Sequence, residues 1–347
     1  RAVGLAAIAI VAAACGSSPS GNHSTSSTTA APGSPGAEAD ALQQEFVAVV
    51  AKVRPQVVEI SSTTNGQLTI GSGVVYDTQG DIVTNDHVVS AAQTYQVQLS
   101  NGQSSMATLV GAYAPDDLAV IRLHGVKGLS AATFGDSSTV QIGDIVLAVG
   151  SPLGLSGSVT EGIVSFNGRA VQESSGGQVV TLPETIQTSA AINPGNSGGA
   201  LVDLDGDVIG IPTLAAADSQ NGGTAPGIGF AIPSNIVKQI AGQLIATGKV
   251  TNSNRGGLGV SSTDAVSLSG APLGALLVTV SAGSAAARAG LVIGDIITEI
   301  DTLKVTDAAG LQDALAPYSP GTVVKVYYLD TNGVHRIASA TLGQLTG

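Results

Sequence analysis

The chain has 347 residues, a formal net charge of −12 at pH 7 and hydrophobic side chains at 43% of its positions. This length suggests about two domains with substantial cores. The acidic charge argues against nucleic-acid binding, because a phosphate backbone would be repelled and no cluster of Lys or Arg offsets the repulsion. The single cysteine, Cys15, excludes an intramolecular disulfide, and the four scattered histidines do not suggest a metal centre.

The N-terminal segment has the pattern of an export signal. An uninterrupted run of small or apolar residues, Ala2 to Ala14, follows the basic Arg1. A membrane span needs about 20 such residues, so the run fits the apolar part of a signal peptide instead. It ends in Ala12-Ala13-Ala14-Cys15-Gly16, which resembles the cleavage box of bacterial lipoproteins, with Ala12 where Leu is usual. We expect a signal peptide over residues 1–15 and lipidation of Cys15; the alternative is an ordinary signal peptide that contains a cysteine.

Residues 16–37 are dominated by Ser, Thr, Gly and Pro and contain no side chains that could build a core, so we expect a disordered tether there. Order is expected from about Glu38. Apolar residues then recur at helical spacing from Leu42 to Val53, and Pro55 ends this predicted helix.

Short β-branched segments separated by Gly, Asn and Asp follow at a spacing of roughly ten residues, which is typical of an antiparallel sandwich or barrel. Asp205-Gly206 predicts a hairpin turn between two of them. The predicted strands are Val57–Ser61, Gly73–Tyr76, Ile82–Thr84, Tyr95–Leu99, Leu118–Leu123, Ile145–Gly150, Val159–Phe166, Ala200–Leu204, Val208–Ile211 and Ile228–Ile232.

A second module is expected after a helix that stops at Gly248 and a linker at Thr251–Gly256. It has its own predicted strands and a helix near Thr306–Leu315. The sequence therefore predicts one domain over residues 38–250 and another over residues 251–347.

The strongest sign of chemistry is Gly195-Asn196-Ser197-Gly198-Gly199. A serine hydroxyl needs an adjacent base to act as a nucleophile, and glycines allow a tight turn whose N–H groups converge on an oxyanion. The string fits both the G-x-S-G-G pattern of chymotrypsin-like enzymes and the G-x-S-x-G elbow of α/β-hydrolases. The elbow requires a following helix and a later histidine. Here a predicted hairpin follows, and the only later histidine, His335, lies in the second module, which favours the first pattern.

His87 is the candidate base, because it stands at a polar break directly after the predicted strand Ile82–Thr84. His124 has no partner motif and is interpreted as an ordinary loop histidine. The acid that would orient the base stands before the strand Leu118–Leu123, where Asp116 and Asp117 are neighbours. Such an acid fixes the imidazole tautomer and stabilises the imidazolium. Periodicity alone leaves both aspartates open.

Seven motifs, in this order along about residues 40 to 345, resemble the HtrA (DegP-type) family of bacterial serine proteases with one PDZ domain. They are Gly71-Ser72-Gly73-Val74-Val75, Thr84-Asn85-Asp86-His87-Val88-Val89, Asp117-Leu118-Ala119-Val120, Gly150-Ser151-Pro152-Leu153-Gly154, Ser158-Val159-Thr160-Glu161-Gly162-Ile163-Val164-Ser165, Asn193-Pro194-Gly195-Asn196-Ser197-Gly198-Gly199-Ala200-Leu201 and Gly227-Ile228-Gly229-Phe230-Ala231-Ile232-Pro233.

The resemblance implies a mostly β protein, with a chymotrypsin-like double antiparallel β-barrel followed by a small α+β PDZ domain. It implies that Ser197 attacks the substrate, that His87 is general base and then acid, and that Asp117, not Asp116, orients His87. The backbone N–H groups of Gly195 and Ser197 would form the oxyanion hole. Ala200 and Ser189 depart from the family, which often has Pro and Asp there, but neither has a catalytic role.

The resemblance also implies a substrate pocket lined by Ile192, Ile228, Gly229 and Phe230. This pocket contains no acid, so a basic side chain would be buried without a partner there. We therefore expect Val, Ala, Leu or Ile before the cleaved bond. The segment between Ser61 and Ile70 lacks the long insertion of hexameric relatives, so the family predicts a homotrimer.

The second module resembles a PDZ domain whose carboxylate-binding loop is Gly257-Leu258-Gly259-Val260. Backbone N–H groups in such a loop hold the C-terminal carboxylate of a peptide that adds a strand to the sheet edge. A later signature, Ser284-Ala285-Ala286-Ala287-Arg288-Ala289-Gly290-Leu291, also matches, with Ala285 where Pro is frequent.

Two functions follow from these patterns. The first is an endopeptidase for unfolded or mislocalised envelope proteins, acting in protein quality control and stress response, with a PDZ domain that binds hydrophobic C-termini. The second is a client-binding, chaperone-like protein with little proteolysis. We expect no metal and no organic cofactor, because the chemistry needs none, and an extracytoplasmic location at the membrane through the lipid on Cys15.

Overall fold

The computed structural model describes residues 35–345, except residues 65, 91, 152–156, 176–177, 194, 218–223 and 268. The predicted signal peptide, Cys15 and most of the predicted tether lie outside the described residues. Helix α1 (Pro35–Val53) begins at Pro35, before the expected start at Glu38, and the 3-10 turn η1 (Arg54–Gln56) follows it.

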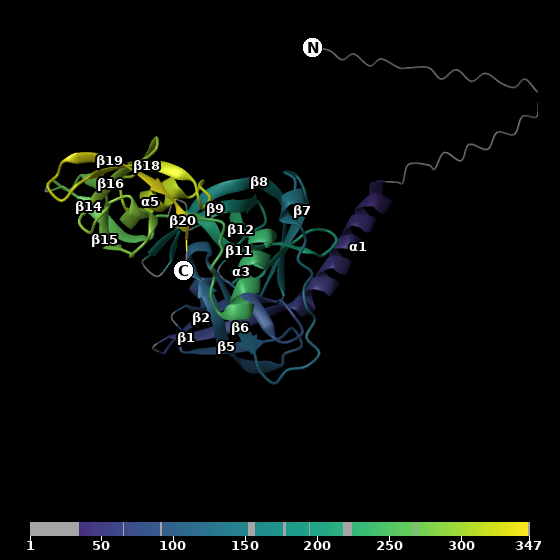
Figure 1. Cartoon of the computed structure of the whole chain (residues 1–347). Helices are drawn as coiled ribbons and strands as arrows, with labels where there is room; N and C mark the ends of the chain where they lie inside the picture. The colour runs from purple at the N-terminus through teal and green to yellow at the C-terminus, as the bar shows by residue number, and fades with distance from the viewer. Residues whose placement is uncertain are drawn as a thin grey trace, which may run out of the picture. The chain divides into compact units, whose positions relative to one another are not determined.

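Six antiparallel strands form a first closed barrel in the order β1-β2-β3-β6-β5-β4 (Figure 1). Its interior is a cluster of buried aliphatic side chains that includes Ile60, Ile82 and Ile121. The short helix α2 (Asp86–Val89) follows β3, and the 3-10 turn η2 (Ala114–Asp116) precedes β6. The strands are β1 (Val57–Thr64), β2 (Gln67–Val75), β3 (Asp81–Thr84), β4 (Thr94–Gln98), β5 (Ser104–Tyr113) and β6 (Leu118–Leu123).

Six further strands close a second antiparallel barrel in the order β10-β11-β12-β9-β8-β7. The predicted Asp205-Gly206 turn joins β10 to β11, with Gly206 at a φ of 73°. The fold class predicted from the motifs is therefore confirmed. The strands are β7 (Ile145–Gly150), β8 (Ser158–Ser175), β9 (Gln178–Thr188), β10 (Ala200–Val202), β11 (Val208–Ala217) and β12 (Thr224–Pro233), with the 3-10 turn η3 (Ser137–Thr139) before β7.

Both barrels share the largest apolar cluster, which joins Val74 and Tyr113 of the first to Leu147 and Ile211 of the second. Helix α3 (Ser234–Thr247) belongs to this cluster and packs on β5, β6, β11 and β12 (Figure 1). A side chain at Gly111 would place its Cβ 2.7 Å from the Gly248 carbonyl oxygen, so the end of α3 approaches β5 closely because that strand has a glycine. This shared core holds the two barrels against each other. Side chains from both barrels can therefore meet at the junction between them.

The C-terminal module has its own core, which includes Leu258, Leu277, Ile300 and Val326. Its main sheet has the order β14-β15-β16-β18-β19, so β14 is an edge strand. The elements are β13 (Gly256–Gly257), β14 (Val260–Val266), β15 (Pro272–Val280), α4 (Ala285–Arg288), β16 (Ile296–Ile300), β17 (Leu303–Lys304), α5 (Ala308–Leu315), β18 (Val323–Leu329), β19 (His335–Thr341) and β20 (Gly343–Gln344).

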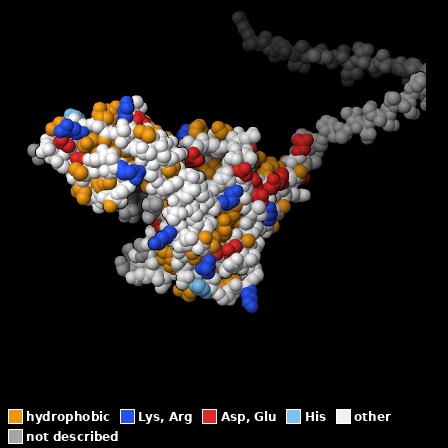
Figure 2. Space-filling model, in the orientation of Figure 1, with side chains coloured by type: hydrophobic (Ala, Val, Ile, Leu, Met, Phe, Trp, Pro, Cys, Tyr) orange, Lys and Arg blue, Asp and Glu red, His pale blue; other side chains and the backbone are white. Residues whose placement is uncertain are grey.

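On the face drawn in Figure 2, Lys and Arg side chains are scattered among uncharged ones and do not form a continuous patch. Within the part of the chain that the structure describes, no helix is both long and apolar enough to cross a membrane.

Candidate active site

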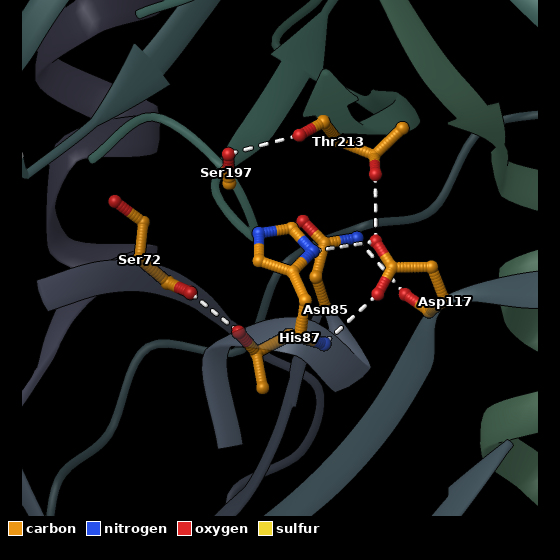
Figure 3. Close-up of polar contacts among 7 residues, drawn as sticks. Ser72, Asn85, His87, Asp117, Ser197 and Thr213 are labelled. Carbon is orange, nitrogen blue, oxygen red and sulfur yellow. Dashed lines mark hydrogen bonds and ion pairs between the residues drawn. The ribbon is translucent and has the colours of Figure 1, made fainter. Parts of the chain in front are cut away.

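The loops of the first barrel bring His87 and Asp117 together (Figure 3). Asp117 follows η2 in the left-handed conformation, with a φ of 47°, and its side chain is buried. One carboxylate oxygen accepts from His87 Nδ1 at 2.9 Å, and the other accepts from the His87 backbone N–H at 2.9 Å. The imidazole is therefore held at two points, and Figure 3 shows its second ring nitrogen on the side toward Ser197.

Asn85 supports this arrangement from the end of β3. Its side chain is fully buried, and its amide donates to the Asp117 backbone carbonyl at 3.0 Å. The contact ties the turn that carries His87 to the turn that carries Asp117. Asn85 belongs to the motif that contains His87, but nothing in the sequence indicates this contact.

Thr213 on β11 links this pair to the second barrel and was not predicted from the sequence. Its hydroxyl donates to Asp117 Oδ2 at 2.6 Å, and its backbone carbonyl accepts from the Ser197 hydroxyl at 2.9 Å. A threonine in a β-strand is common, so its residue type offered no signal. The structure thus connects His87, Asp117, Thr213 and Ser197 by a continuous series of hydrogen bonds (Figure 3).

The glycines around Ser197 are needed because the loop is crowded by backbone. A Cβ at Gly198 would lie 2.2 Å from the Ser72 carbonyl oxygen, and Gly198 has a φ of 80°. A Cβ at Gly199 would lie 2.4 Å from the Val149 carbonyl oxygen. The loop therefore fits between β2 and β7 only when these two positions carry no side chain, and this fit places Ser197 at the junction of the barrels.

Periodicity in the sequence could not decide whether Asp116 or Asp117 is the partner of His87. In the structure the two aspartates have different partners. Asp116 is buried and pairs with Arg255, whose Nη1 lies 2.6 Å from Asp116 Oδ1. Burial raises the pKa of the Asp116 carboxyl, and Arg255 opposes this shift. Asp117 is the residue that contacts His87, as the family motif implied.

Asp86, next to the histidine, adds an electrostatic feature to the site. Burial and the nearby Asp117 raise the pKa of the Asp86 carboxyl to about 6, and His87 acts in the opposite direction. This carboxyl therefore changes charge in the range in which an imidazole ordinarily titrates.

The residues predicted to line a substrate pocket come from the nucleophile loop and from β12. Ile192 and Phe230 are buried, whereas Ile228 is 37% exposed. Gly229 faces Ile192, because a Cβ there would lie 2.4 Å from Ile192 Cγ1. The structure thus brings Ile192 against Gly229, and any side chain at Gly229 would displace it.

The predicted carboxylate loop lies at the start of the C-terminal module. Leu258 is buried in the module core, and Gly259 has a φ of 72°. A Cβ at Gly259 would lie 2.5 Å from Ser284 Cβ, so the turn requires glycine there. Val260 begins β14, the edge strand, and the loop therefore leads directly into an edge to which a peptide could add.

His124 lies apart from this site, with its Nε2 2.9 Å from the hydroxyl of Thr108 on an exposed surface. Among the described residues, no group of three or more His, Cys, Asp or Glu side chains is arranged to hold a metal ion.

A family model described as a trypsin-like peptidase domain matches residues 71–211, and one described as a PDZ domain matches residues 277–326. The chain is 39% identical to the serine protease PepD of Mycobacterium tuberculosis over 99% of this chain and 77% of that protein. It is 42% identical to the periplasmic serine endoprotease DegP of Escherichia coli over 71% of this chain and 51% of that protein. Among solved structures, the chain is similar to the HtrA-type protease AlgW with a decapeptide, with a TM-score of 0.57 and 32% sequence identity. The match covers 86% of this chain and 98% of the AlgW chain.

Proposed function

Because this chain belongs to the HtrA family of trypsin-like serine proteases and is a serine endopeptidase, we propose that it degrades or processes unfolded or mislocalised proteins of the cell envelope with a triad of Ser197, His87 and Asp117. The observation that carries the proposal is the hydrogen-bonded series from His87 through Asp117 and Thr213 to Ser197. This series links the candidate nucleophile, base and orienting acid in one site, which supports their roles in acyl transfer.

The proposed reaction proceeds through an acyl-enzyme. Ser197 Oγ forms a bond to the scissile carbonyl carbon while its proton moves to the second ring nitrogen of His87. The C–N bond then breaks, and the leaving amine takes that proton. Water attacks the ester in the same way, with His87 again as base, and releases the acid product and Ser197.

Two further groups serve this reaction. Asp117 accepts from His87 Nδ1 and stabilises the imidazolium that forms. The N–H groups of Gly195 and Ser197 would donate to the oxyanion, which is where preorganised donors lower the barrier most. Ile192, Ile228, Gly229 and Phe230 would receive the residue before the cleaved bond, and their apolar character favours Val, Ala, Leu or Ile.

The PDZ domain would bind the hydrophobic C-terminus of a protein or peptide. The loop Gly257-Leu258-Gly259-Val260 would hold the carboxylate with its N–H groups, and the peptide would pair with the free edge of β14. This binding would recruit substrates or activate the protease domain.

An extracytoplasmic location at the membrane is supported by the signal-like sequence of residues 1–15 and by the periplasmic relative DegP. Lipidation of Cys15 would supply the anchor. Self-association into a homotrimer is supported by the short segment between Ser61 and Ile70, which lacks the long insertion of hexameric members of the family. Labelling with a radioactive fatty acid in a Cys15→Ala comparison, and the mass of the purified protein in solution, test these two proposals.

The test of the main proposal is cleavage of reduced casein by the purified full chain beside its Ser197→Ala variant. We expect cleavage by the parent and a fall of roughly 10⁵- to 10⁶-fold in the variant. Near-normal cleavage by the variant would contradict the role of Ser197. Sequencing of the fragments shows whether Val, Ala, Leu or Ile precedes the cut.

A second candidate, a client-holding protein with latent proteolysis, is favoured by one observation. The Ser197 hydroxyl donates to the Thr213 carbonyl, so it must rotate to deliver its proton to His87. If the parent leaves casein intact, peptides with hydrophobic C-termini separate the two candidates. Cleavage on their addition identifies a latent protease, and protection of casein from aggregation without cleavage identifies the client-holding protein.

A further inference from the structure

Every polar group of Ser72 on β2 is hydrogen-bonded, and two of them, the backbone N–H and the hydroxyl, donate to the nucleophile loop. It is fully buried, and its backbone N–H donates to the Ser197 carbonyl at 2.9 Å. Its hydroxyl donates to the Gly195 carbonyl at 2.5 Å and accepts from the Ser151 N–H at 2.8 Å. Its own carbonyl accepts from the Thr84 hydroxyl at 2.7 Å. Ser72, a residue of the first barrel, therefore holds the nucleophile loop of the second barrel by hydrogen bonds on both sides of Asn196.

These contacts determine where the loop N–H groups point. A peptide unit is planar and trans, so a fixed carbonyl also fixes the direction of the next N–H. Ser72 fixes the carbonyls of Gly195 and Ser197, and the Gly199 N–H holds the Asn196 carbonyl between them at 2.9 Å. The Ser197 N–H belongs to that middle peptide. The Asn196 carbonyl therefore sets its direction, and the Ser72 contacts to the Gly195 and Ser197 carbonyls hold the peptides on either side.

The Ser72 hydroxyl is important because the nucleophile loop could adopt another conformation in its absence. Gly195 has a φ of 103°, in a region where glycine moves between conformations with little cost. Without the hydroxyl, the Gly195 carbonyl and the Ser151 N–H would each lose a partner in a buried place, where an unpaired polar group is unfavourable. Rotation of the Gly195–Asn196 peptide would release its carbonyl but would also break the bond from the Asn196 N–H to the Asn193 carbonyl, and the adjoining peptide that carries the Ser197 N–H would shift with it.

From this geometry we propose that Ser72 is a positioning residue for peptide hydrolysis: its hydroxyl holds the Gly195 carbonyl and so keeps the neighbouring Ser197 N–H aimed at the oxyanion. The inference rests on the proposed role of Ser197. It predicts that loss of the hydroxyl lowers the rate of the chemical step and leaves substrate affinity nearly unchanged.

The test is the rate at which a fluorophosphonate labels Ser197 in the full chain, together with kcat and KM on a peptide substrate. Ser234→Ala is the matched control. Ser234 is also fully buried, and its hydroxyl also donates to a backbone carbonyl, that of Gly135 at 2.8 Å, but it does not contact the nucleophile loop. Rates are measured well below the melting temperature of each variant, so that loss of folded protein does not contribute.

We expect Ser72→Ala to slow labelling and kcat by about 10- to 100-fold, less than the loss of an oxyanion donor itself, which costs about 10²- to 10³-fold. KM should change less than about threefold, Ser234→Ala should keep the parental rates, and Ser72→Thr, which keeps the hydroxyl, should recover part of the loss. If Ser72→Ala does not fold, Ser72→Cys replaces it, because a thiol is a weak donor of similar size.

Equal labelling rates for the Ser72 and Ser234 variants would overturn the proposal, and so would a Ser72→Thr variant as slow as the Ala or Cys variant. A fall confined to KM would overturn it as well. Failure of the proposed function is recognised separately, because the parent protein would then show neither labelling nor cleavage, with or without a hydrophobic C-terminal peptide.

Discussion

Arg255 Nη1 lies 2.6 Å from Asp116 Oδ1, and Asp116 immediately precedes Asp117, the residue that holds His87. The same nitrogen donates to the Pro115 carbonyl at 2.5 Å, and Nη2 donates to the Thr181 carbonyl of β9 at 3.0 Å. The guanidinium thus fixes the turn η2 at two successive residues. Because Gly256 follows Arg255 and begins the C-terminal module, the linker itself anchors the turn that presents Asp117.

We therefore expect Arg255→Ala to lower both stability and activity. It leaves the buried Asp116 carboxylate without its cation, and breaking a buried pair on one side costs about 3–5 kcal/mol. The free energy of unfolding and kcat on a peptide substrate measure the two effects. The double variant Arg255→Ala/Asp116→Asn should recover part of the stability, because it removes the unpaired charge. A double variant no more stable than Arg255→Ala would show that the lost contacts to Pro115 and Thr181 dominate instead.

Thr213→Val tests the connection between the barrels at the Asp117 carboxylate. Valine keeps the shape of threonine but cannot donate to Asp117 Oδ2, and a hydrogen bond to a charged group contributes about 1.5–3 kcal/mol. We expect kcat to fall by about tenfold or more with little change in KM, while Thr213→Ser, which keeps the donor, stays near the parent. Equal kcat values for the Val and Ser variants would remove Thr213 from the site.

The sequence predicted the barrels from their runs of β-branched residues and missed β5 and β9. β5 (Ser104–Tyr113) exposes half of its residues without a regular alternation, and β9 (Gln178–Thr188) contains a proline, so neither has the pattern that identifies a strand. Both were needed to close their barrels. Closure follows from the pairing of segments distant in the chain, which no local pattern reports.

The same limit applies within the candidate site. His87, Asp117 and Ser197 stand in distinctive motifs, from which the sequence predicts them. Thr213 and Ser72 act through single hydroxyl groups that meet the site only after the chain has folded. Hydroxyl residues are ordinary in β-strands, so their roles depend on geometry that the sequence does not display.

Asp86 predicts a specific dependence of stability on pH. Burial raises the pKa of its carboxyl from the ordinary value of 3.8 to about 6 in the folded protein. Between these values the folded state binds more protons than the unfolded state, so this group's contribution to stability falls as the pH rises through the interval. Asp86→Asn removes that contribution.

Melting temperatures of the parent and of Asp86→Asn at pH 4 and at pH 7 provide the measurement. The variant should gain stability relative to the parent as the pH increases, because the amide carries no charge at either pH. The full difference should be reached only above about pH 6. A constant difference between the two proteins across this range would mean that Asp86 titrates alike in the folded and unfolded states.

Gly198→Ala, compared with Gly125→Ala, separates crowding at the nucleophile loop from backbone strain. Both glycines have positive φ, 80° and 72°, so each alanine carries a similar conformational penalty of about 1–2 kcal/mol. A Cβ at Gly125 meets nothing within 4 Å, whereas one at Gly198 would lie 2.2 Å from the Ser72 carbonyl oxygen and 2.4 Å from Thr84 Oγ1.

We expect Gly125→Ala to keep the parental rate of labelling with a fluorophosphonate and to lose only the stability that corresponds to the backbone strain. Gly198→Ala should lose several kcal/mol more, because backbone must move apart, and labelling should nearly cease. Similar losses of stability in the two variants would show that the loop can withdraw from β2 at little cost, and the close fit between the barrels would then not be what holds Ser197 in place.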